Sequence, residues 1–320
     1  MNRTSRSACI AGAIALLAQG AVWGAVDTKS RQAAAAAEAR AVAPAMANAL
    51  KVPPAAPAST EIQLPPMSAE DIVKRNVAAR GGLAAWQKVQ AMSLRGKLDA
   101  GQKRRDGGNI GLTKQDARAL VKAKLASAAS APAADVIQLP FALDLQRPNK
   151  TRLEIPFRGD TALQVYDGKQ GWKLRPYLGR HEVEPYTADE LKIAASEQQL
   201  DGPLIDHAAK GIAVAVDGGE RVEGRKAYRL RLTLPGGEQR RLWVDAENFL
   251  DLKIEGAPRR FDGKMRSVAT YFKDYRPVDG LQVARLLETR VEGTQQSERI
   301  IVEQVALNAV VDASRFAKPQ

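Results

Sequence analysis

The sequence is poor in the residues that nucleophilic and metal-assisted catalysis require. Among 320 residues it has one cysteine, Cys9, and two histidines, His181 and His207. Neither histidine has the spacing of a zinc site. The sequence also lacks a Gly-x-Ser-x-Gly elbow, a Ser-x-x-Lys motif, a phosphate-binding glycine loop and a dinucleotide fingerprint. We therefore expect a protein that is not an enzyme, with no catalytic residue, no metal and no cofactor.

Two weak catalytic alternatives stay open at this point. His207 follows Asp206 in a segment, Pro203 to Ala209, that we expect to form a helical turn, and it could act as the base of a hydrolase. The carboxylates of Glu288 and Glu292, or of Glu182 and Glu184, could form an acid–base pair, but most carboxylates of the chain stand at outward strand positions or in turns.

The chain also lacks a long hydrophobic run. Its most apolar stretch, residues 8 to 18, follows Arg3 and Arg6 and precedes small residues. This pattern predicts a secretory signal peptide over residues 1–24, with cleavage after Gly24, and the run is too short to span a membrane. Cys9 would leave with the signal and lacks a lipid-attachment pattern. We expect an exported protein of the bacterial periplasm without a lipid anchor; the alternative is a retained N-terminal anchor.

Aromatic residues make up 5% of the chain, and the formal net charge is +12. The basic residues form no compact cluster with interleaved aromatics, so the sequence does not indicate nucleic-acid binding. Removal of the two signal-peptide arginines leaves about +10 (12 minus 2). In the periplasm, lipid headgroups and other anionic envelope components would be the natural partners of such a charge. A basic, solvated surface without a specific partner is the alternative.

The organisation of the chain changes at Ser68. Residues 25–67 are rich in alanine and proline and predict a disordered tether. Ser68 to Asp71 is a capping-box pattern that begins a helix, and Gly81-Gly82 ends it. A second helix over Leu83 to Gln90 and a strand over Met92 to Ala100 follow. Residues 68–320 would form one folded domain, with a surface insertion at about 102–132.

From Val222 to Gly256 apolar residues alternate with polar ones, and turn sequences interrupt the alternation twice, so this segment predicts three antiparallel strands. Trp243 is the large apolar exception on the polar side. Roughly eleven strands joined by tight turns follow one another over the whole domain, and a helix over Thr187 to Gln199 interrupts them. This pattern favours an α+β fold: a large curved antiparallel sheet with a few helices packed on one face.

The apolar face of such a sheet can be a filled core or can enclose a cavity. Moving an acyl chain through water costs about 0.8 kcal/mol for each CH₂, so an exported lipid needs an apolar shelter. We expect the wall of a hydrophobic ligand cavity, with the two tryptophans near its rim, and an ordinary packed core remains the alternative. The expected ligand-binding residues are Trp86, Trp172, Leu230, Leu232, Leu242, Val244, Leu252 and Ile254.

Several strings resemble the LolA-like family of periplasmic outer-membrane lipoprotein-sorting proteins. They are SAEDIVKRNVAARGGLAAWQKVQAMSLRGKL from Ser68, YDGKQGW from Tyr166, LDGPLID from Leu200, the Val222 to Gly256 meander and DYRPVDGL from Asp274. The resemblance covers Ser68 to Pro319. It implies an unclosed β-barrel of about eleven strands, in which helices form a lid over a hydrophobic cavity for the acyl chains of lipoproteins.

Two functions follow as expectations. In the first, the protein is a monomeric, non-enzymatic carrier or chaperone that binds a lipid or an acylated lipoprotein and moves it toward the outer membrane. In the second, the same fold is an envelope sensor that docks on an inner- or outer-membrane protein through its basic edge or its tether. The tether and the insertion are departures from the compact carrier, and the resemblance does not identify the cargo.

Overall fold

The computed structural model describes residues 61–102, 136–197, 200–261, 264–294 and 297–320. The expected signal peptide, most of the tether and the insertion lie outside these residues. None of the helices in the described ranges is both long enough and apolar enough to cross a membrane.

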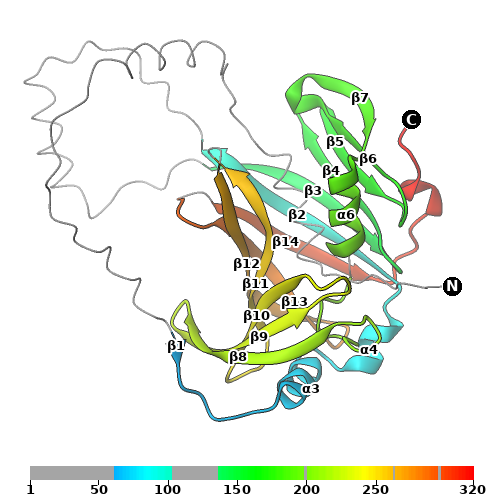
Figure 1. The fold of residues 1–320 in the computed structure, drawn as a ribbon. Helices are drawn as coiled ribbons and strands as arrows, with labels where there is room; N and C mark the ends of the chain where they lie inside the picture. Colours follow the sequence, from blue (N-terminus) through cyan, green and yellow to red (C-terminus); the bar gives the residue numbers. More distant parts are fainter. Residues whose placement is uncertain (1–60, 103–135, 198–199, 262–263, 295–296) are drawn as a thin grey trace, which may run out of the picture.

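The described residues form one 14-stranded antiparallel sheet, in the order β1-β8-β9-β10-β11-β12-β13-β14-β2-β3-β4-β5-β6-β7 (Figure 1). The sheet is unclosed, because β1 and β7 are its two edges. The expected fold class is confirmed, although the sheet has more strands than the eleven we counted from the sequence. The strands are β1 (Glu61–Ile62), β2 (Ala91–Gln102), β3 (Val136–Gln146), β4 (Lys150–Phe157), β5 (Asp160–Tyr166), β6 (Gly171–Arg175), β7 (Arg180–Pro185), β8 (Ala213–Val222), β9 (Arg225–Thr233), β10 (Gln239–Asp245), β11 (Asp251–Phe261), β12 (Lys264–Val278), β13 (Leu281–Val291) and β14 (Ser297–Leu307).

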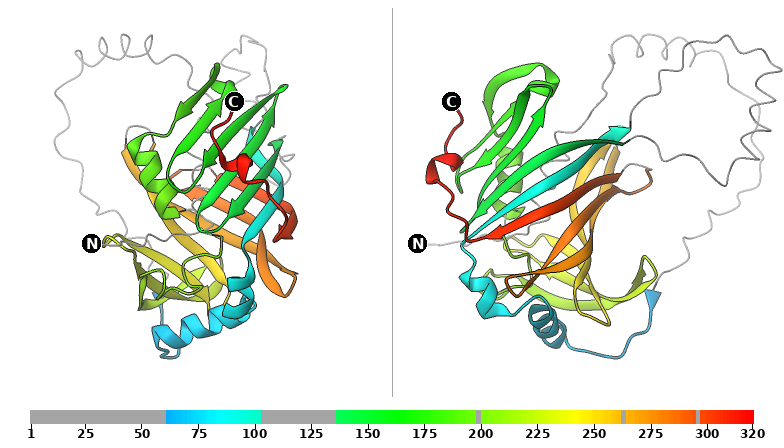
Figure 2. Two further views of the ribbon diagram at one scale, coloured as in Figure 1. Left: turned by 90° about the vertical axis from the view of Figure 1, so that its right-hand side faces the viewer. Right: turned by 180° about the vertical axis from the view of Figure 1, so that it is seen from behind.

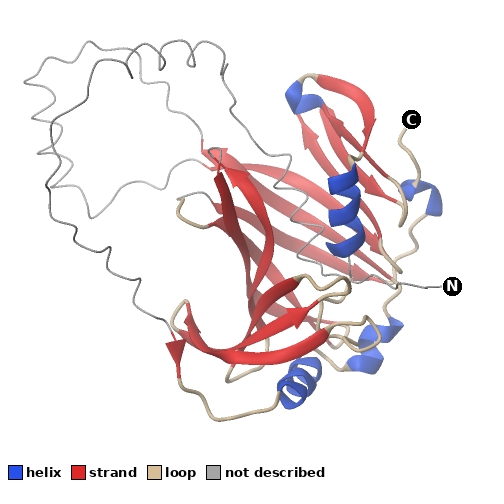
Figure 3. Cartoon of the chain, viewed as in Figure 1, coloured by secondary structure: helices blue, strands red, loops and turns tan. Residues whose placement is uncertain are grey.

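Within the described ranges, three α-helices accompany the sheet: α3 (Ala69–Ala79), α4 (Leu83–Lys88) and α6 (Ala188–Glu197). All three pack on one face, which we call the inner face. There α3 covers β8 to β11, Trp86 of α4 joins a core cluster with β2 and β3, and Ala194 of α6 packs on Tyr166 of β5. Figures 2 and 3 show α3 and α4 at one end of the curved sheet and α6 beside β4 to β6.

The helices begin where the sequence predicts. The Ser68 hydroxyl accepts a hydrogen bond from the Asp71 amide at 3.0 Å, and Thr187 caps α6 through the Glu190 amide at 3.3 Å. The segment from Pro203 to Ala209 forms bends and turns rather than the helical turn that we expected. Its hydrogen bonds run to its own backbone and to neighbouring side chains.

Removal of the Ser68 cap gives a first prediction. The variant Ser68→Ala should lower the free energy of unfolding by about 1 kcal/mol, because the Asp71 amide loses its acceptor at the helix start. Urea unfolding followed by circular dichroism measures this loss. Ser68→Thr is the matched control, since it keeps the hydroxyl, and it should retain most of the stability. Equal losses in both variants would contradict the capping role.

The residues just before Ser68 contact the sheet. Glu61 and Ile62 pair with Glu220 and Gly219 of β8, and the Tyr228 hydroxyl donates to the Pro65 carbonyl at 3.1 Å. The last residues of the segment that we expect to be a tether therefore pack on the sheet edge. The segment thereby covers the exposed backbone groups of β8 over two residues.

The opposite, outer face carries the C-terminal 3₁₀-helix η2 (Ala313–Phe316). Asp144 is 1% exposed there and accepts hydrogen bonds from Arg95, Arg315 and Ser93. These partners lower its pKa against the effect of burial, which is the largest single influence and acts upward. The contacts attach the C-terminus to β3 and explain why a carboxylate is tolerated at a buried position.

Candidate functional site

The inner face has one continuous apolar surface, and helices cover only part of it. At the β8–β11 end, Leu230, Leu232, Leu242 and Val244 are at most 1% exposed, and α3 packs on them through Ile72 and Val73. The register continues this surface across the sheet, since Leu242 pairs with Ile254 and Ile254 pairs with Thr270. This end is therefore a filled core.

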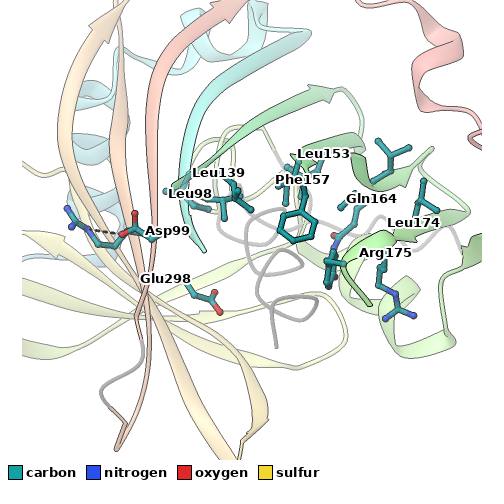
Figure 4. A pocket seen from close by; sticks show the side chains of 15 residues that line it. Leu98, Asp99, Leu139, Leu153, Phe157, Gln164, Leu174, Arg175 and Glu298 are labelled. Atoms are coloured by element: carbon teal, nitrogen blue, oxygen red, sulfur yellow. Dashed lines mark ion pairs between the residues drawn. The ribbon is translucent and has the colours of Figure 1, made fainter. Parts of the chain in front are cut away.

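A first cavity, of about 60 Å³, lies on the inner face beyond that core. Figure 4 shows Leu98, Leu139, Leu153 and Phe157 converging on it from β2, β3 and β4, with Asp99, Glu298 and Arg175 at its margin. The remaining lining residues come from the same strands, from β5, β6 and β14, and from η1 (Pro176–Leu178): Ile155, Ala162, Leu163, Gln164, Leu174, Tyr177, Arg299 and Ile300.

Charged groups at the margin of the first cavity are held by ion pairs. Arg175 contacts Glu184 at 2.5 Å, and Arg299 lies 4.0 Å from Asp99. Burial raises the pKa of Tyr177, which therefore stays neutral at physiological pH. The pKa of Glu184 is lowered, because its hydrogen bonds and charge interactions with Arg175 and Arg180 outweigh desolvation, so it stays ionised. Apart from Gln164 and Tyr177, the residues that line the cavity between these charged groups are apolar.

A second cavity, of about 50 Å³, adjoins the first. Leu287 lines the second cavity and pairs directly with Ile300, which lines the first. Its other apolar walls come from α4, β2, β10, β11, β12, β13 and β14, and from the loop after α6: Trp86, Met92, Leu94, Pro203, Leu242, Ile254, Phe272, Val283, Ala284 and Val302. We call the two neighbouring cavities, together with the paired residues Leu287 and Ile300 that lie between them, the trough of the inner face.

Polar groups enter the second cavity at one place. The guanidinium of Arg80 lies over the Trp86 ring, 4.9 Å from its centroid, and 3.4 Å from the carboxylate of Asp251. Both side chains are 7% exposed. Burial raises the pKa of Asp251, although Arg80 and a hydrogen bond from Asn76 at 2.9 Å act in the opposite direction. The Trp86 indole donates to the Arg80 carbonyl at 2.9 Å.

The structure divides the eight residues that the sequence suggested as ligand-binding. Trp86, Leu242 and Ile254 line the second cavity, whereas Leu230, Leu232 and Val244 are packed beneath α3 and line neither cavity. For this last group, the alternative that we left open, an ordinary core, describes what the structure shows. The role of the first group in ligand binding remains a proposal.

Two of the eight residues lie on the outer face, which corrects their expected position. Leu252 groups with Trp243 and Ala227, because the β10–β11 register shifts between Trp243 and Val244 and moves Leu252 away from Ile254. Trp172 pairs with Val165, next to Lys173. Lys173 contacts Glu190 of α6 on the inner face, so Trp172 points to the opposite side.

Sequence reasoning passed over the strands that form the first cavity. The apolar lining residues stand at alternating positions of β2, β3 and β4: Leu98, Leu139, Leu153 and Ile155. These strands show the same alternation of apolar and polar residues as the Val222–Gly256 meander. Alternation alone does not tell which strands of a sheet the helices leave uncovered.

The catalytic alternatives find little support in the described residues. Nδ1 of His207 lies 3.0 Å from the carbonyl oxygen of Ile212, a contact that fixes the end of a turn. Glu184 is held by Arg175, and Glu288 by Lys273 at 2.9 Å and Arg290 at 2.8 Å. Within the described ranges, no three histidine, cysteine or acidic side chains are grouped so that they could hold a metal ion.

Glu288 gives a prediction for the pH dependence of stability. A hydrogen bond from Arg290 is the largest of the effects that lower its pKa to about 2, and Lys273 adds to it while burial opposes. Because the folded-state pKa lies below the unfolded value of about 4.3, Glu288 stabilises the fold above pH 5 and loses this effect as the pH falls toward 2.

We expect Glu288→Gln to lower the free energy of unfolding by about 1–2 kcal/mol at pH 7 and by much less near pH 2. Denaturant unfolding of both proteins across this range measures the difference. The same substitution at Glu303, a 47% exposed partner of Lys97, is the control and should have little effect. A deficit at Glu288 that does not change with pH would contradict the assignment.

Comparison with known proteins gives matches to solved structures at low identity. A LolA superfamily protein from Nitrosomonas europaea is 11% identical, with a TM-score of 0.47 over 79% of this chain and 99% of that one. A DUF1329 family protein from Desulfovibrio piger is 12% identical, with a TM-score of 0.47 over 78% and 97%. A domain assigned to outer membrane lipoprotein sorting, from Vibrio parahaemolyticus, is 11% identical, with a TM-score of 0.45 over 78% and 95%.

No family model matches the sequence, and no curated protein matches it. At these identities and TM-scores the matched structures carry no argument about this chain, so its function has to be argued from the chain's own cavities.

Proposed function

We propose that the protein is a non-enzymatic carrier that holds the acyl chain of a lipid or a lipoprotein in the trough of its inner face. The observation that carries this proposal is the pair of apolar cavities whose walls meet at the paired residues Leu287 and Ile300, on a sheet whose other end is a filled core. A polar margin around a mostly apolar interior suits a ligand with an apolar chain and a polar end.

The two cavities are small in this state. Ligand sites for small molecules commonly have volumes of about 300–1,000 Å³, so a complete acyl chain requires the trough to widen. The wall can yield at Leu98, Ile155, Phe157 and Phe272, because these four side chains are only half-buried. We infer that binding displaces them while the core beneath α3 stays fixed. Each CH₂ of the ligand that moves out of water into the trough contributes about 0.8 kcal/mol of favourable free energy. This gain would drive the opening.

The proposed setting is the periplasm. The features that support it are the signal-peptide pattern of residues 1–24 and the positive charge of the chain. Acylated lipoproteins and free lipids are the cargo, and delivery toward the outer membrane is the direction that we propose. The carrier would act as a monomer, because the trough needs no second copy to complete its walls.

Extraction of lipid from vesicles tests the proposal. The full chain without residues 1–24 is incubated with vesicles that contain a radiolabelled acyl lipid, and the two are then separated by flotation. A carrier moves label into the soluble fraction in proportion to protein, at close to one acyl ligand per chain. Protein that floats with vesicles and extracts no label would overturn the carrier and favour the sensor that docks at a membrane.

A further inference from the structure

An open pocket of about 340 Å³ lies over β12, β13 and β14, and we call it the outer pocket. Leu286 and Ile301, which pair with each other in the register, are its apolar floor. Their chain neighbours Leu287 and Ile300 face the trough, so Leu286 and Ile301 face the opposite side of the sheet. The remaining lining residues are mostly charged: Asp274, Arg276, Arg285, Arg299, Val302 and Glu303.

The strands on both sides of β13 depart from regular geometry at this pocket. Asp274 of β12 has a φ of +50°, which lies outside the extended region of a strand. In β14 the register with β2 shifts between Val302 and Gln304, so that Glu303 is an extra residue. Bulges of this kind re-aim side chains and are frequent beside functional sites. Both irregular residues, Asp274 and Glu303, stand in the wall of the pocket.

The two carboxylates in the wall already have cationic partners. Asp274 lies 2.9 Å from Arg276, and Glu303 lies 2.7 Å from Lys97. Because each of these pairs is neutral as a whole, neither repels an incoming anion as strongly as a free carboxylate would. The positive charge that the pocket offers to a ligand therefore comes from its other two arginines.

Those two arginines, Arg285 and Arg299, have no hydrogen-bonded carboxylate in the described part of the chain. Arg299 is 47% exposed, and its ion pair with Asp99 spans 4.0 Å. Nη1 of Arg285 donates to the Glu303 carbonyl at 3.4 Å, whereas Nη2 of Arg285 has no acceptor among the described residues and is not a buried atom. A guanidinium group with donors to spare is the side chain best suited to bind phosphate oxygens.

We propose that the outer pocket binds a phosphate monoester through Arg285 and Arg299. A phosphate monoester has a charge of about −1.5 to −2 at pH 7, which two guanidinium groups balance. The floor of Leu286 and Ile301 would contact the carbon atoms next to the phosphate. This site goes beyond the proposed carrier function and does not depend on it. A soluble glycerophosphate and a phosphatidate headgroup share the required chemistry.

A matched pair of soluble ligands tests the site. Glycerol 3-phosphate and glycerate are of similar size, and they differ in whether the anionic group is a phosphate or a carboxylate. Isothermal titration calorimetry with the full chain without residues 1–24 measures both dissociation constants. We expect glycerol 3-phosphate to bind about tenfold more tightly than glycerate, and added salt to weaken its binding.

Two variants test the assignment, and Arg299 is left unchanged because it also lines the first cavity. Arg285→Gln removes one guanidinium group, and Ile301→Asp adds a carboxylate to the floor while every arginine remains. Each should weaken glycerol 3-phosphate about tenfold and leave the affinity for an acyl probe unchanged. Arg241→Gln is the control: Arg241 is 53% exposed on β10, far from the pocket in the order of strands, and pairs with Glu255 at 3.3 Å. Melting curves show whether the variants are folded.

Flotation identifies the source of the phosphate. We expect the protein to float with phosphatidylcholine vesicles that contain phosphatidic acid, not with phosphatidylcholine alone, and to be displaced by glycerol 3-phosphate. Binding of glycerol 3-phosphate without flotation would support the site and assign it to soluble phosphate esters. Equal affinities for glycerol 3-phosphate and glycerate, or unchanged affinity in both folded variants, would overturn the site. Acyl-probe binding would then still test the carrier separately.

Discussion

Replacement of Leu98 by tryptophan should abolish acyl-ligand binding, with at least a hundredfold rise in the dissociation constant. Leu98 lies on β2 and its side chain forms part of the first cavity, opposite Leu139 in the register. An indole there would occupy a space of about 60 Å³ that the ligand chain has to enter. Because Leu98 is only half-buried, the larger ring can be accommodated without the full penalty of overpacking.

The neighbouring position provides the control for this experiment. Lys97 lies on the same strand, points to the outer face and is 48% exposed. Lys97→Trp introduces the same ring outside the trough and should leave the affinity for the probe within about twofold. Titration of both variants with a fluorescent acyl probe measures their dissociation constants, and melting curves show whether both variants are folded. Equal affinities for the two variants would show that the ligand does not enter at Leu98.

Truncation of Leu230 to alanine should destabilise the fold strongly and leave ligand affinity nearly unchanged. Leu230 is fully buried beneath α3 and lines neither cavity. Loss of its side chain leaves a void in a packed core, which we expect to cost about 3 kcal/mol of the free energy of unfolding. Urea unfolding gives this value, and probe binding at low temperature gives the affinity of the folded variant.

Arg231→Ala is the matched control for Leu230. Arg231 is one residue away on β9, faces outward and is 46% exposed, so its truncation should change the free energy of unfolding by less than about 0.5 kcal/mol. A Leu230→Ala variant that keeps its stability but loses ligand would contradict our division of the inner face. It would restore Leu230 to the ligand-binding wall that the sequence first suggested.

The fold could be predicted from the sequence because its signals are local. Ser68 and Thr187 are cap residues, and tight turns such as Pro235-Gly236-Gly237 join strands whose apolar residues alternate. Antiparallel neighbours follow directly from such turns. The number of strands was underestimated, because short or interrupted stretches such as Glu61–Ile62 have no clear alternation of their own.

The candidate site could be predicted only in part, since it depends on contacts between distant segments. The shift of register at Trp243 turns Leu252 to the outer face, and the sequence of β11 alone gives no sign of it. Similarly, the apolar faces of β4 and β9 look alike as sequence. What separates them is that α3 covers β9 and leaves the inner face of β4 beside a cavity.

The Arg80–Asp251 pair illustrates the same limit. Arg80 stands at the end of a helix, where a basic residue is commonplace, and Asp251 starts a strand 171 residues later. Nothing in either local pattern predicts that the two side chains meet inside an apolar cavity. The three-dimensional structure is needed to see both the pair and the donors that it leaves without an acceptor.

Photo-crosslinking tests the central claim, that the inner-face trough holds an acyl chain, most directly. A palmitoyl ligand with a diazirine midway along its chain is bound to the full chain without residues 1–24, irradiated and mapped by peptide mass spectrometry. We expect adducts on the β2, β3 and β4 residues that line the first cavity, among them Leu98, Leu139 and Leu153, and we expect these adducts to be lost in Leu98→Trp. Adducts confined to outer-face residues such as Lys97 and Arg231, or adducts that Leu98→Trp does not reduce, would contradict it.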